Sequence, residues 1–492
     1  MLLSVIDRVV ALPSCPARIA RLAVAFGAIA SVASAWLCHN AEAVVPGPAA
    51  RRTHAAPPRP ALERLPPGST MVPLENIEGV VLVPATLKGG GRDTTGPLVI
   101  DTGAGFLALD GPLANLLGIE GVRPGTSGVM LSGGFLPRLE LGTMQLDHVA
   151  PILTLDVNVI RRATGRDVLG LAGQHVFAGR ALWIDYEGGR AAFVPSVSAD
   201  PTEQPAAGSN GDSSIPGDAT TAPAVKLRVL RARRSRRLLA PLLSASARAI
   251  PFRLAGDHKM LVRARFRDSA TAAAGGWLTL VFDTGATKCA LFEPALTEDH
   301  PTSRRWRSVT GLVAPTLVGS PSARVTLAPA LELETTEPAR PLRRTDVDCV
   351  AITSDLSSGL SAAVGEHVSG LLGYSFFKRY RVAIDYPNLT LWLDPYARVH
   401  ELHPFEYSHV GLQLERDGES IRVVGVAARS PADSVGIATG DTLVAIGGRE
   451  ARPTDLVELT DLLEGAPGTR VELTLRRDGR QRTYRLVRRR LL

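Results

Sequence analysis

Short apolar runs with polar residues at alternate positions recur along the chain, and turns rich in glycine and proline separate them, a pattern that predicts β-strands. Val262, Ala264 and Phe266, for example, alternate with arginines. A second stretch, 80–87, is mainly apolar and is followed by three glycines at 89–91, which predict a hairpin turn. We therefore expect a mostly-β chain.

Two large segments, 72–195 and 248–398, repeat one another and are called lobe 1 and lobe 2 below. The sequence GPLVIDTGAG (Gly96–Gly105) in lobe 1 matches LTLVFDTGAT (Leu278–Thr287) in lobe 2. Each is a short apolar strand that ends in Asp-Thr-Gly-Ala. Because the same motif occurs twice in matching contexts, it indicates an internal structural repeat rather than two unrelated turns.

The repeat continues downstream of these motifs. Residues Gly170–Tyr186 align without a gap to Gly370–Tyr386. Both lobes are therefore predicted to use one order of elements: strand, Asp-Thr-Gly loop, strand, hairpin, a Gly-apolar-x-Gly turn, a short helix and a strand. The triplets Ile-Asp-Tyr that end both copies are interpreted as structural.

The first 71 residues are expected to lie outside the folded lobes. Three arginines precede an uncharged, alanine-rich run, Leu22–Cys38, and the triplet Ala41–Ala43 suits cleavage before Val44. Residues 1–43 are therefore predicted to be a signal peptide or, if uncleaved, a membrane anchor. In both cases the remainder is exported to the periplasm or beyond, or stays tethered to the inner membrane. Residues 44–71 are predicted to form a proline-rich tether.

A second break in composition separates the two lobes at 196–247. Its first part is rich in Ser, Pro, Gly, Asp and Thr, and its second part contains the basic run Lys226–Arg237. We predict a flexible, basic linker with a solvated face. The alternative is that the basic run contacts anionic lipid or an acidic partner.

The overall composition excludes several classes of function. The chain has 492 residues, 45% of them hydrophobic, which is sufficient for about three ordinary domains. The net charge of +7 would ordinarily suggest nucleic acid as a partner, but only five of the 55 basic residues are lysines and no aromatic residues interleave with the basic runs. The histidines and cysteines have no metal-ligand spacing, and no Walker loop is present. We therefore expect no nucleic acid, no metal and no cofactor.

Two cysteines, Cys289 and Cys349, lie in lobe 2 within apolar, strand-like runs. In an oxidising compartment they could form a disulfide, and two buried free thiols are an equal alternative. No histidine motif accompanies Cys289, so a nucleophilic role is not expected.

The aspartates of the repeated motif are Asp101 and Asp283. If the lobes pack about a pseudo-two-fold axis, the two carboxyl groups meet at the interface, where like charges cannot both ionise and one proton is shared. Such a pair can hold a water molecule. The ionised carboxylate takes a proton from the water as it attacks a peptide carbonyl, and the protonated carboxyl polarises that carbonyl. The repeat thus predicts a catalytic pair that hydrolyses peptide bonds.

The residues after each aspartate suit the support of such a loop. Gly103 and Gly285 allow a sharp turn that brings backbone N–H groups to the carboxylates. Thr102 and Thr284 can offer hydroxyl groups across the interface and lock the two loops together. We predict that these four residues support the active-site loops.

These motifs, Asp101–Ala104 and Asp283–Ala286, together with the later Gly370–Gly373 turn, resemble the retropepsin-like aspartic proteases. The resemblance implies two acid-protease β-barrel lobes in a pseudo-two-fold arrangement, with Asp101 and Asp283 as the catalytic pair. It also implies flap hairpins near 129–135, with a tip at 132–134, and near 310–320. Because many members pair their lobes by dimerisation, the chain is expected to act as a monomer or a homodimer. One departure is Gly105, which stands where lobe 2 has Thr287.

The segment 405–487 carries a different motif. Val410–Leu414, then Ser430-Pro431-Ala432 and the run Gly436–Gly448, resemble the PDZ domain attached to bacterial exported proteases. A groove helix is expected at about 454–463, ended by Gly465.

The PDZ resemblance implies a site for C-terminal peptide tails. Loop N–H groups would bind the terminal carboxylate, and the following strand would accept an extended peptide by β-addition. The residues assigned to this site are Gly411, Leu412, Gln413 and Leu414. The alternative is a PDZ fold that packs on the lobes without binding any tail.

The sequence therefore predicts a mostly-β, exported aspartic endopeptidase with two retropepsin-like lobes and a C-terminal PDZ domain. Its expected partners are protein or peptide substrates and the C-terminal tails that the PDZ domain holds. An alternative from a different class is a non-catalytic exported protein that uses degenerate protease lobes as a peptide clamp.

Overall fold

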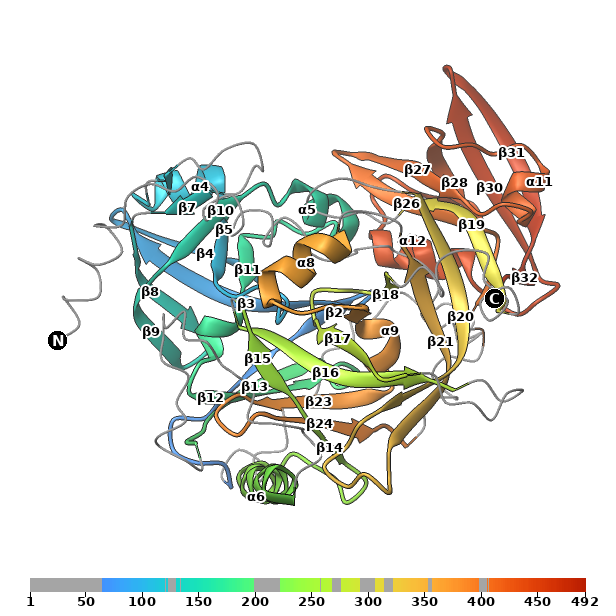
Figure 1. Ribbon diagram of the computed structural model, residues 1–492. Helices are drawn as coiled ribbons and strands as arrows, with labels where there is room; N and C mark the ends of the chain where they lie inside the picture. Colours follow the sequence, from blue (N-terminus) through green and yellow to red (C-terminus); the bar gives the residue numbers. More distant parts are fainter. Residues whose placement is uncertain are drawn as a thin grey trace.

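The computed structural model describes most of the chain from residue 64 onward (Figure 1). The described residues are 64–119, 121–122, 130–132, 134–198, 222–256, 258–267, 276–292, 306–313, 322–352, 356–397, 405 and 407–492. The predicted signal or anchor segment and most of the predicted tether lie outside them. Within the described residues, no helix is long and apolar enough to cross a membrane.

Lobe 1 is built mainly from strands. They are β1 (Thr70–Pro73), β2 (Glu75–Ile77), β3 (Val80–Gly89), β4 (Arg92–Ile100), β5 (Leu107–Asp110), β6 (Gly121–Val122), β7 (Met130–Ser132), β8 (Leu136–Leu141), β9 (Met144–Val149), β10 (Ile152–Leu155), β11 (Gly170–Ala172), β12 (Arg180–Asp185) and β13 (Arg190–Pro195). Two short helices, α4 (Gly111–Leu116) and α5 (Asn158–Thr164), and the 3₁₀ turn η1 (Gln174–Phe177) complete it. β1 begins inside the predicted tether, which therefore ends before Thr70.

Lobe 2 contains the corresponding set of elements. Its strands are β14 (Arg248–Pro251), β15 (Arg253–Ala255), β16 (Lys259–Phe266), β17 (Leu278–Phe282), β18 (Cys289–Leu291), β19 (Ser308–Val313), β20 (Ser322–Leu333), β21 (Leu342–Ala351), β22 (Gly370–Leu372), β23 (Tyr380–Asp385) and β24 (Thr390–Pro395). The helices are α8 (Leu356–Val364) and α9 (Tyr374–Phe377). The alternation predicted at 262–266 is confirmed, because the apolar side chains are buried and the arginines between them are only partly so.

The strand pairing of the two lobes is the same. In lobe 1, β4 runs parallel to β11, which is antiparallel to β5, and β5 is parallel to β10. In lobe 2, β17, β22, β18 and β21 have these same relations. Each lobe thus has a strand that ends at Asp-Thr-Gly and pairs with the strand of the later Gly-apolar-x-Gly turn. This pairing confirms the internal repeat predicted from the sequence.

A six-stranded sheet joins the lobes, in the order β1-β13-β12-β23-β24-β14. The central strands β12 and β23 are antiparallel, and Trp183 lies opposite Ala383. Because these two residues also occupy equivalent positions of the repeat, a pseudo-two-fold axis passes between them. The two lobes therefore meet as equivalent halves along one hydrogen-bonded seam.

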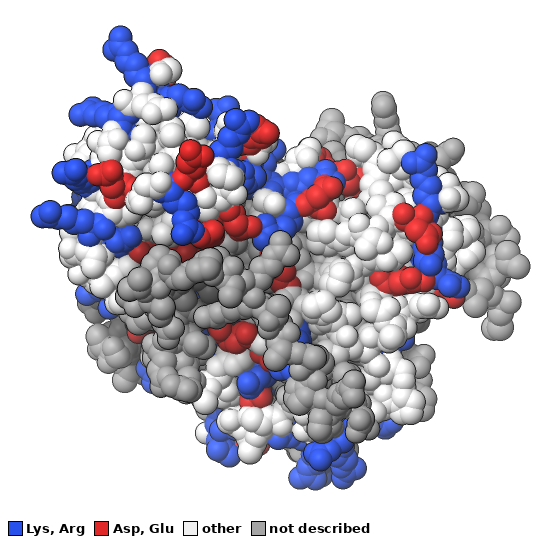
Figure 2. All heavy atoms as spheres, turned by 180° about the vertical axis from the view of Figure 1, so that it is seen from behind, with Lys and Arg blue, Asp and Glu red and all other residues white. Residues whose placement is uncertain are grey.

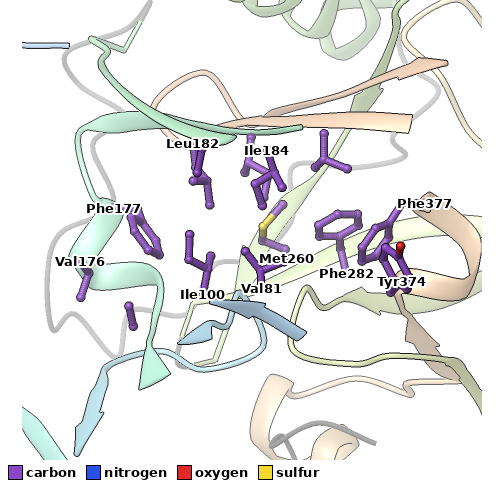
Figure 3. Close-up of a cluster of buried hydrophobic side chains, with 14 of the residues drawn as sticks. Val81, Ile100, Val176, Phe177, Leu182, Ile184, Met260, Phe282, Tyr374 and Phe377 are labelled. Carbon is purple, nitrogen blue, oxygen red and sulfur yellow. The ribbon is translucent and has the colours of Figure 1, made fainter. Parts of the chain in front are cut away.

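A buried apolar cluster drawn from both lobes packs against this sheet and fills the interface (Figure 3). Ile100 and Phe282, the residues immediately before the two Asp-Thr-Gly loops, are fully buried in it. Burying one large apolar side chain contributes about 1.5 to 3 kcal/mol. The cluster therefore fixes the ends of β4 and β17, and with them the positions of the loops.

The predicted flexible linker 196–247 is wrong in its second half. A helix, α6 (Ala222–Leu238), packs on the interlobe sheet, and the indole N–H of Trp392 donates to Ser235 Oγ at 2.9 Å. Ala232 and Ser235 of α6 are buried three residues apart, and Leu239, Leu242 and Leu243, which follow the helix, are buried as well. Arg233, Arg234 and Arg237 beside these positions are exposed, and they obscured the buried face in the sequence. The first half of the predicted linker lies mostly outside the described residues.

The C-terminal domain is a separate small β-domain with its own core. Its strands are β25 (Ser408–His409), β26 (Leu412–Asp417), β27 (Ser420–Val426), β28 (Thr442–Ile446), β29 (Arg449–Glu450), β30 (Arg470–Arg477), β31 (Arg480–Val487) and β32 (Arg489–Arg490). Its helices are α11 (Pro431–Ser434) and α12 (Leu456–Leu463). The predicted groove helix is confirmed by α12, whose N-cap Asp455 accepts from the Val457 N–H at 2.9 Å.

Charged side chains are distributed unevenly over the surface (Figure 2). Basic and acidic groups are interspersed on the C-terminal domain, whereas a purely basic group gathers at the bottom of the view, the end at which α6 lies in Figure 1. On the face shown in Figure 2, the basic groups of the C-terminal domain are thus interrupted by acidic ones.

Candidate active site

The loops that follow β4 and β17 bring Asp101 and Asp283 together at the lobe interface. Both side chains have 0% exposure. The backbone N–H groups of the two aspartates donate to equivalent carbonyls, those of Ala172 and Leu372, each at 3.1 Å. A Cβ placed on Gly103 would lie 2.5 Å from the Asp283 carboxyl carbon, so only glycine fits between the loops here. The two carboxyl groups thus face one shared site.

Backbone N–H groups orient each carboxyl. The Gly103 N–H donates to Asp101 Oδ1 at 2.8 Å and the Ala104 N–H donates to the same atom at 3.1 Å. In lobe 2, the Gly285 N–H donates to Asp283 Oδ1 at 2.8 Å. Hydrogen bonds of this kind favour the ionised form and fix the orientation of the carboxylate plane.

The two threonines form a reciprocal pair across the interface. The Thr102 N–H donates to Thr284 Oγ1 at 3.0 Å, and the Thr284 N–H donates to Thr102 Oγ1 at 3.0 Å. Each hydroxyl in turn donates to a carbonyl of the opposite lobe, that of Phe282 at 3.3 Å and that of Ile100 at 2.9 Å. Four buried hydrogen bonds therefore tie the two aspartate loops to each other.

Burial dominates the proton affinity of the pair. It raises the pKa of Asp101 from 3.8 to about 6, although the interaction with Asp283 and the nearby ammonium of Lys259 work in the opposite direction. The pKa of Asp283 is raised well above its usual range, first by burial and then by the negative charge of Asp101. The pair therefore holds one proton over a range of pH, with the negative charge on Asp101.

Lys259 beside this pair was not found by sequence reasoning. Extending the register of β16 and β17, in which Leu261 lies opposite Val281, brings Lys259 opposite Asp283. The same step in lobe 1 brings Val80 opposite Asp101. The lysine is fully buried. Comparing the two copies of the repeat position by position would have revealed a cation in place of valine.

We expect Lys259→Met to move the pH profile of any activity of the pair to higher pH, because the buried ammonium lowers the pKa of both aspartates. Lys259→Arg keeps the charge and should keep the profile. Val80→Met makes a comparable apolar change at the equivalent place in lobe 1 and serves as the matched control. A profile of kcat/KM against pH that does not move in Lys259→Met would contradict this electrostatic role.

The predicted flap segments are only partly described. In lobe 1, Ser132 is the last residue of β7 and pairs with Gly121 of β6, and residue 133 is not among the described residues, so the tip at 132–134 stays a prediction. In lobe 2, the described part of the second segment belongs to β19, which packs against β27 of the C-terminal domain. Residues 129, 133 and 314–320 lie outside the described residues.

The four residues assigned to tail binding in the C-terminal domain are all buried, three of them in β26. The Gly411 N–H donates to His409 Nδ1 at 2.8 Å. The amide of Gln413 accepts from the Val313 N–H and donates to the Val313 carbonyl, both at 3.2 Å, and so bonds to lobe 2. The β26 segment is thus engaged with another part of the same chain.

Cys289 and Cys349 lie opposite each other on the parallel strands β18 and β21, and both are free and buried. Of the two alternatives left open by the sequence, the structure contains the pair of free thiols. Within the described residues, no group of three or more His, Cys, Asp or Glu side chains could hold a metal ion.

Comparison with known proteins identifies one domain. The family model of the PDZ domain matches residues 422–477, so the C-terminal domain is a PDZ domain. No curated protein matches the chain.

Several solved structures are similar to parts of the chain. A photosystem II D1 C-terminal processing protease is 30% identical over 17% of this chain, with a TM-score of 0.17, and the chain spans only 24% of that protein. The PDZ domain of a carboxy-terminal protease from Vibrio cholerae, in complex with a peptide, is 21% identical over 17% of this chain and 93% of its own, with a TM-score of 0.16. An aspartic proteinase from Irpex lacteus is 9% identical over 67% of this chain and 98% of its own, with a TM-score of 0.36.

Proposed function

We propose that this chain is an exported aspartic endopeptidase whose catalytic pair is Asp101 and Asp283. The observation that carries the proposal is the meeting of two equivalent, fully buried carboxyls at a pseudo-two-fold interface, tied by reciprocal threonine hydrogen bonds. A pair that shares one proton supplies a base and an acid at the same place.

Each carboxyl has a distinct role in the proposed reaction. Asp101, which has the lower pKa, is the ionised member and takes the proton of a water molecule held between the carboxyls. Protonated Asp283 donates a hydrogen bond to the substrate carbonyl as the water oxygen attacks its carbon. Asp283 passes its proton to the carbonyl oxygen, which gives a tetrahedral diol. The diol collapses as Asp101 gives the proton taken from the water to the leaving amide nitrogen and Asp283 recovers a proton from a diol hydroxyl, so no covalent enzyme intermediate forms.

The PDZ domain adds a second site in this proposal. Its loop at Gly411 and the strand β26 would hold the C-terminal tail of a substrate or partner protein by β-addition. Export of the chain, by signal peptide or anchor, remains a proposal that rests on the sequence of residues 1–43.

The proposal is tested by incubating the full chain with casein, an unstructured protein, from about pH 3 to 8, with and without a pepstatin-type inhibitor. We expect cleavage with an acidic optimum that the inhibitor abolishes. A folded chain that cleaves nothing at any pH would overturn the assignment and favour the non-catalytic peptide clamp.

A further inference from the structure

The tail-binding groove of a PDZ domain lies between one strand and one helix, because a peptide adds to the strand and its side chains enter the space beside the helix. In this chain the two borders are β26 and α12. Among the described residues, β26 pairs with β27 alone, so its other edge is the one that a peptide would use. What occupies the space beside that edge therefore decides whether a tail can bind.

The segment of lobe 1 formed by α5 and the two residues after it, called the α5 segment below (158–166), contacts both borders of the groove. α5 lies against β26, and Gly165 lies against Arg416 of β26 and Leu456 of α12: a Cβ placed on it would be 3.6 Å from Arg416 Nε and 3.8 Å from Leu456 Cβ. Val457 of α12 packs on the buried apolar cluster of lobe 1. The α5 segment is thus seated across the groove.

Ion pairs hold the α5 segment on the PDZ domain. Arg166 Nη1 lies 2.7 Å from Asp455 Oδ2, and the same guanidinium binds Glu75 of lobe 1 with its other nitrogens. Arg162 of α5 lies 3.9 Å from Glu415 of β26. One arginine therefore bridges the lobe to the N-cap of the groove helix.

The N-terminal end of β26 is bound to lobe 2 through the paired hydrogen bonds between Gln413 and Val313. Just after β27, the Ala428 N–H also donates to the Thr310 carbonyl of lobe 2, at 2.8 Å. The PDZ domain therefore touches both halves of the proposed protease, lobe 1 through the groove and lobe 2 through β19.

Two half-buried carboxyls are expected to make this docking sensitive to pH. Glu78, in the β2–β3 turn of lobe 1, and Asp461, on α12, each have a buried oxygen with no hydrogen-bond partner among the described residues. Burial raises the pKa of Glu78 to about 7, against the pull of Lys288 and Lys378. Burial also raises the pKa of Asp461 to about 8, with further contributions from Glu78 and Asp455.

From these contacts we infer that the α5 segment is the resident occupant of the PDZ groove, and that a C-terminal tail binds only when the PDZ domain leaves lobe 1. The inference rests on the tail-binding part of the proposed function and does not need proteolysis. Tail binding and docking on lobe 1 then exclude each other, so a bound tail changes what both lobes touch.

A disulfide lock tests this directly. In Gly165→Cys/Leu456→Cys the two Cβ atoms stand at about 3.8 Å, within the range that a disulfide requires. Fluorescein-labelled decapeptides with a free C-terminal Leu, Val or Ala are titrated against the full chain, oxidised and then reduced, after mass spectrometry has verified the linkage. We expect binding to be at least tenfold weaker in the oxidised chain and to recover on reduction. Amidated peptides should not bind in either state.

A variant that opens the groove gives the opposite result. Arg166→Ala removes the bridge to Asp455 and should tighten peptide binding several-fold. Arg138→Ala breaks an ion pair with Asp147 on the surface of lobe 1 and should change nothing. Equal binding by the oxidised and reduced lock would overturn the inference. Absence of saturable binding in every state, Arg166→Ala included, would overturn it as well, because an opened groove would then accept no tail. Casein cleavage, measured in parallel, separates these results from failure of the catalytic proposal.

The two interface carboxyls add a pH dependence to the same titration. A carboxyl whose pKa is raised in the docked state favours docking when protonated, and this contribution declines as the pH rises from about 4 toward 7 to 8. Peptide binding should therefore be tighter at pH 8 than at pH 5. Glu78→Gln should weaken this dependence, whereas Glu140→Gln, which affects an ion pair with Lys88 elsewhere on lobe 1, should leave it intact.

Discussion

Asp101→Asn and Asp283→Asn are each expected to lower kcat/KM for peptide cleavage by about a thousandfold or more, because proton transfer to and from the reacting groups contributes on the order of 10² to 10⁴ and an amide can neither take nor share the proton. The loss should be similar in the two variants, since base and acid act as one unit. Initial rates on a quenched peptide substrate measure it. Asp385→Asn changes another fully buried aspartate, bonded to Ser196, and should retain cleavage.

The same substitutions should not unfold the protein. A carboxyl whose pKa is raised by burial stabilises the fold when protonated and opposes it when ionised, so the wild type loses stability as the pH rises from about 4 to 6. For Asp101 this loss is on the order of 3 kcal/mol. Asp101→Asn should lack it, and unfolding curves at pH 4 and 6.5 would reveal the difference. An inactive variant that is also unfolded would leave the loss of cleavage without a chemical explanation and would contradict the expected separation.

Thr102→Val and Thr284→Val are expected to be the most destabilising conservative substitutions near the site. Each removes one hydroxyl and leaves a buried N–H and a buried carbonyl of the opposite lobe unsatisfied, at a cost of about 1 to 3 kcal/mol for each group. A combined loss of about 3 kcal/mol follows. Because the effect falls on the contact between the lobes, denaturant unfolding followed by tryptophan fluorescence should detect it.

Thr154→Val is the matched control for these variants. Thr154 is equally buried in lobe 1, but its Oγ1 has no hydrogen-bond partner among the described residues. The same exchange of hydroxyl for methyl should therefore leave stability unchanged or raise it. Similar losses in Thr154→Val and Thr102→Val would mean that shape, and not the reciprocal hydrogen bonds, decides the cost.

The repeat made the fold predictable, because the same run of residues had to form the same strands in both lobes. Leu98–Ile100 and Leu280–Phe282 are continuous apolar runs, and both became buried strands that end at an aspartate. The C-terminal domain was predictable for a similar reason, since Gly411, the Ser-Pro-Ala turn and the α12 pattern are local signals. The mutual approach of Asp101 and Asp283 followed from symmetry alone.

What could not be predicted depends on packing between distant segments. Helix α6 was not predicted, because its seven basic residues suggested a segment exposed to solvent. The small residues between them form a buried face. The contact between Gly165 of the α5 segment and Leu456 joins residues that are almost three hundred positions apart in the sequence. No local sequence pattern predicts such a contact. Lys259 lies on the strand before the matched runs Gly96–Gly105 and Leu278–Thr287, so the repeated motif itself gave no sign of it.

The different residues opposite the two aspartates separate this chain from any assembly of identical halves. A homodimer must place the same side chain beside both carboxyls, so neither carboxyl is distinguished until a substrate binds. With Val80 on one side and Lys259 on the other, the two halves of this chain are no longer equivalent, and the surroundings of the two carboxyls differ before any substrate arrives. Joining the lobes in one polypeptide thus permits a division of labour that strict symmetry forbids.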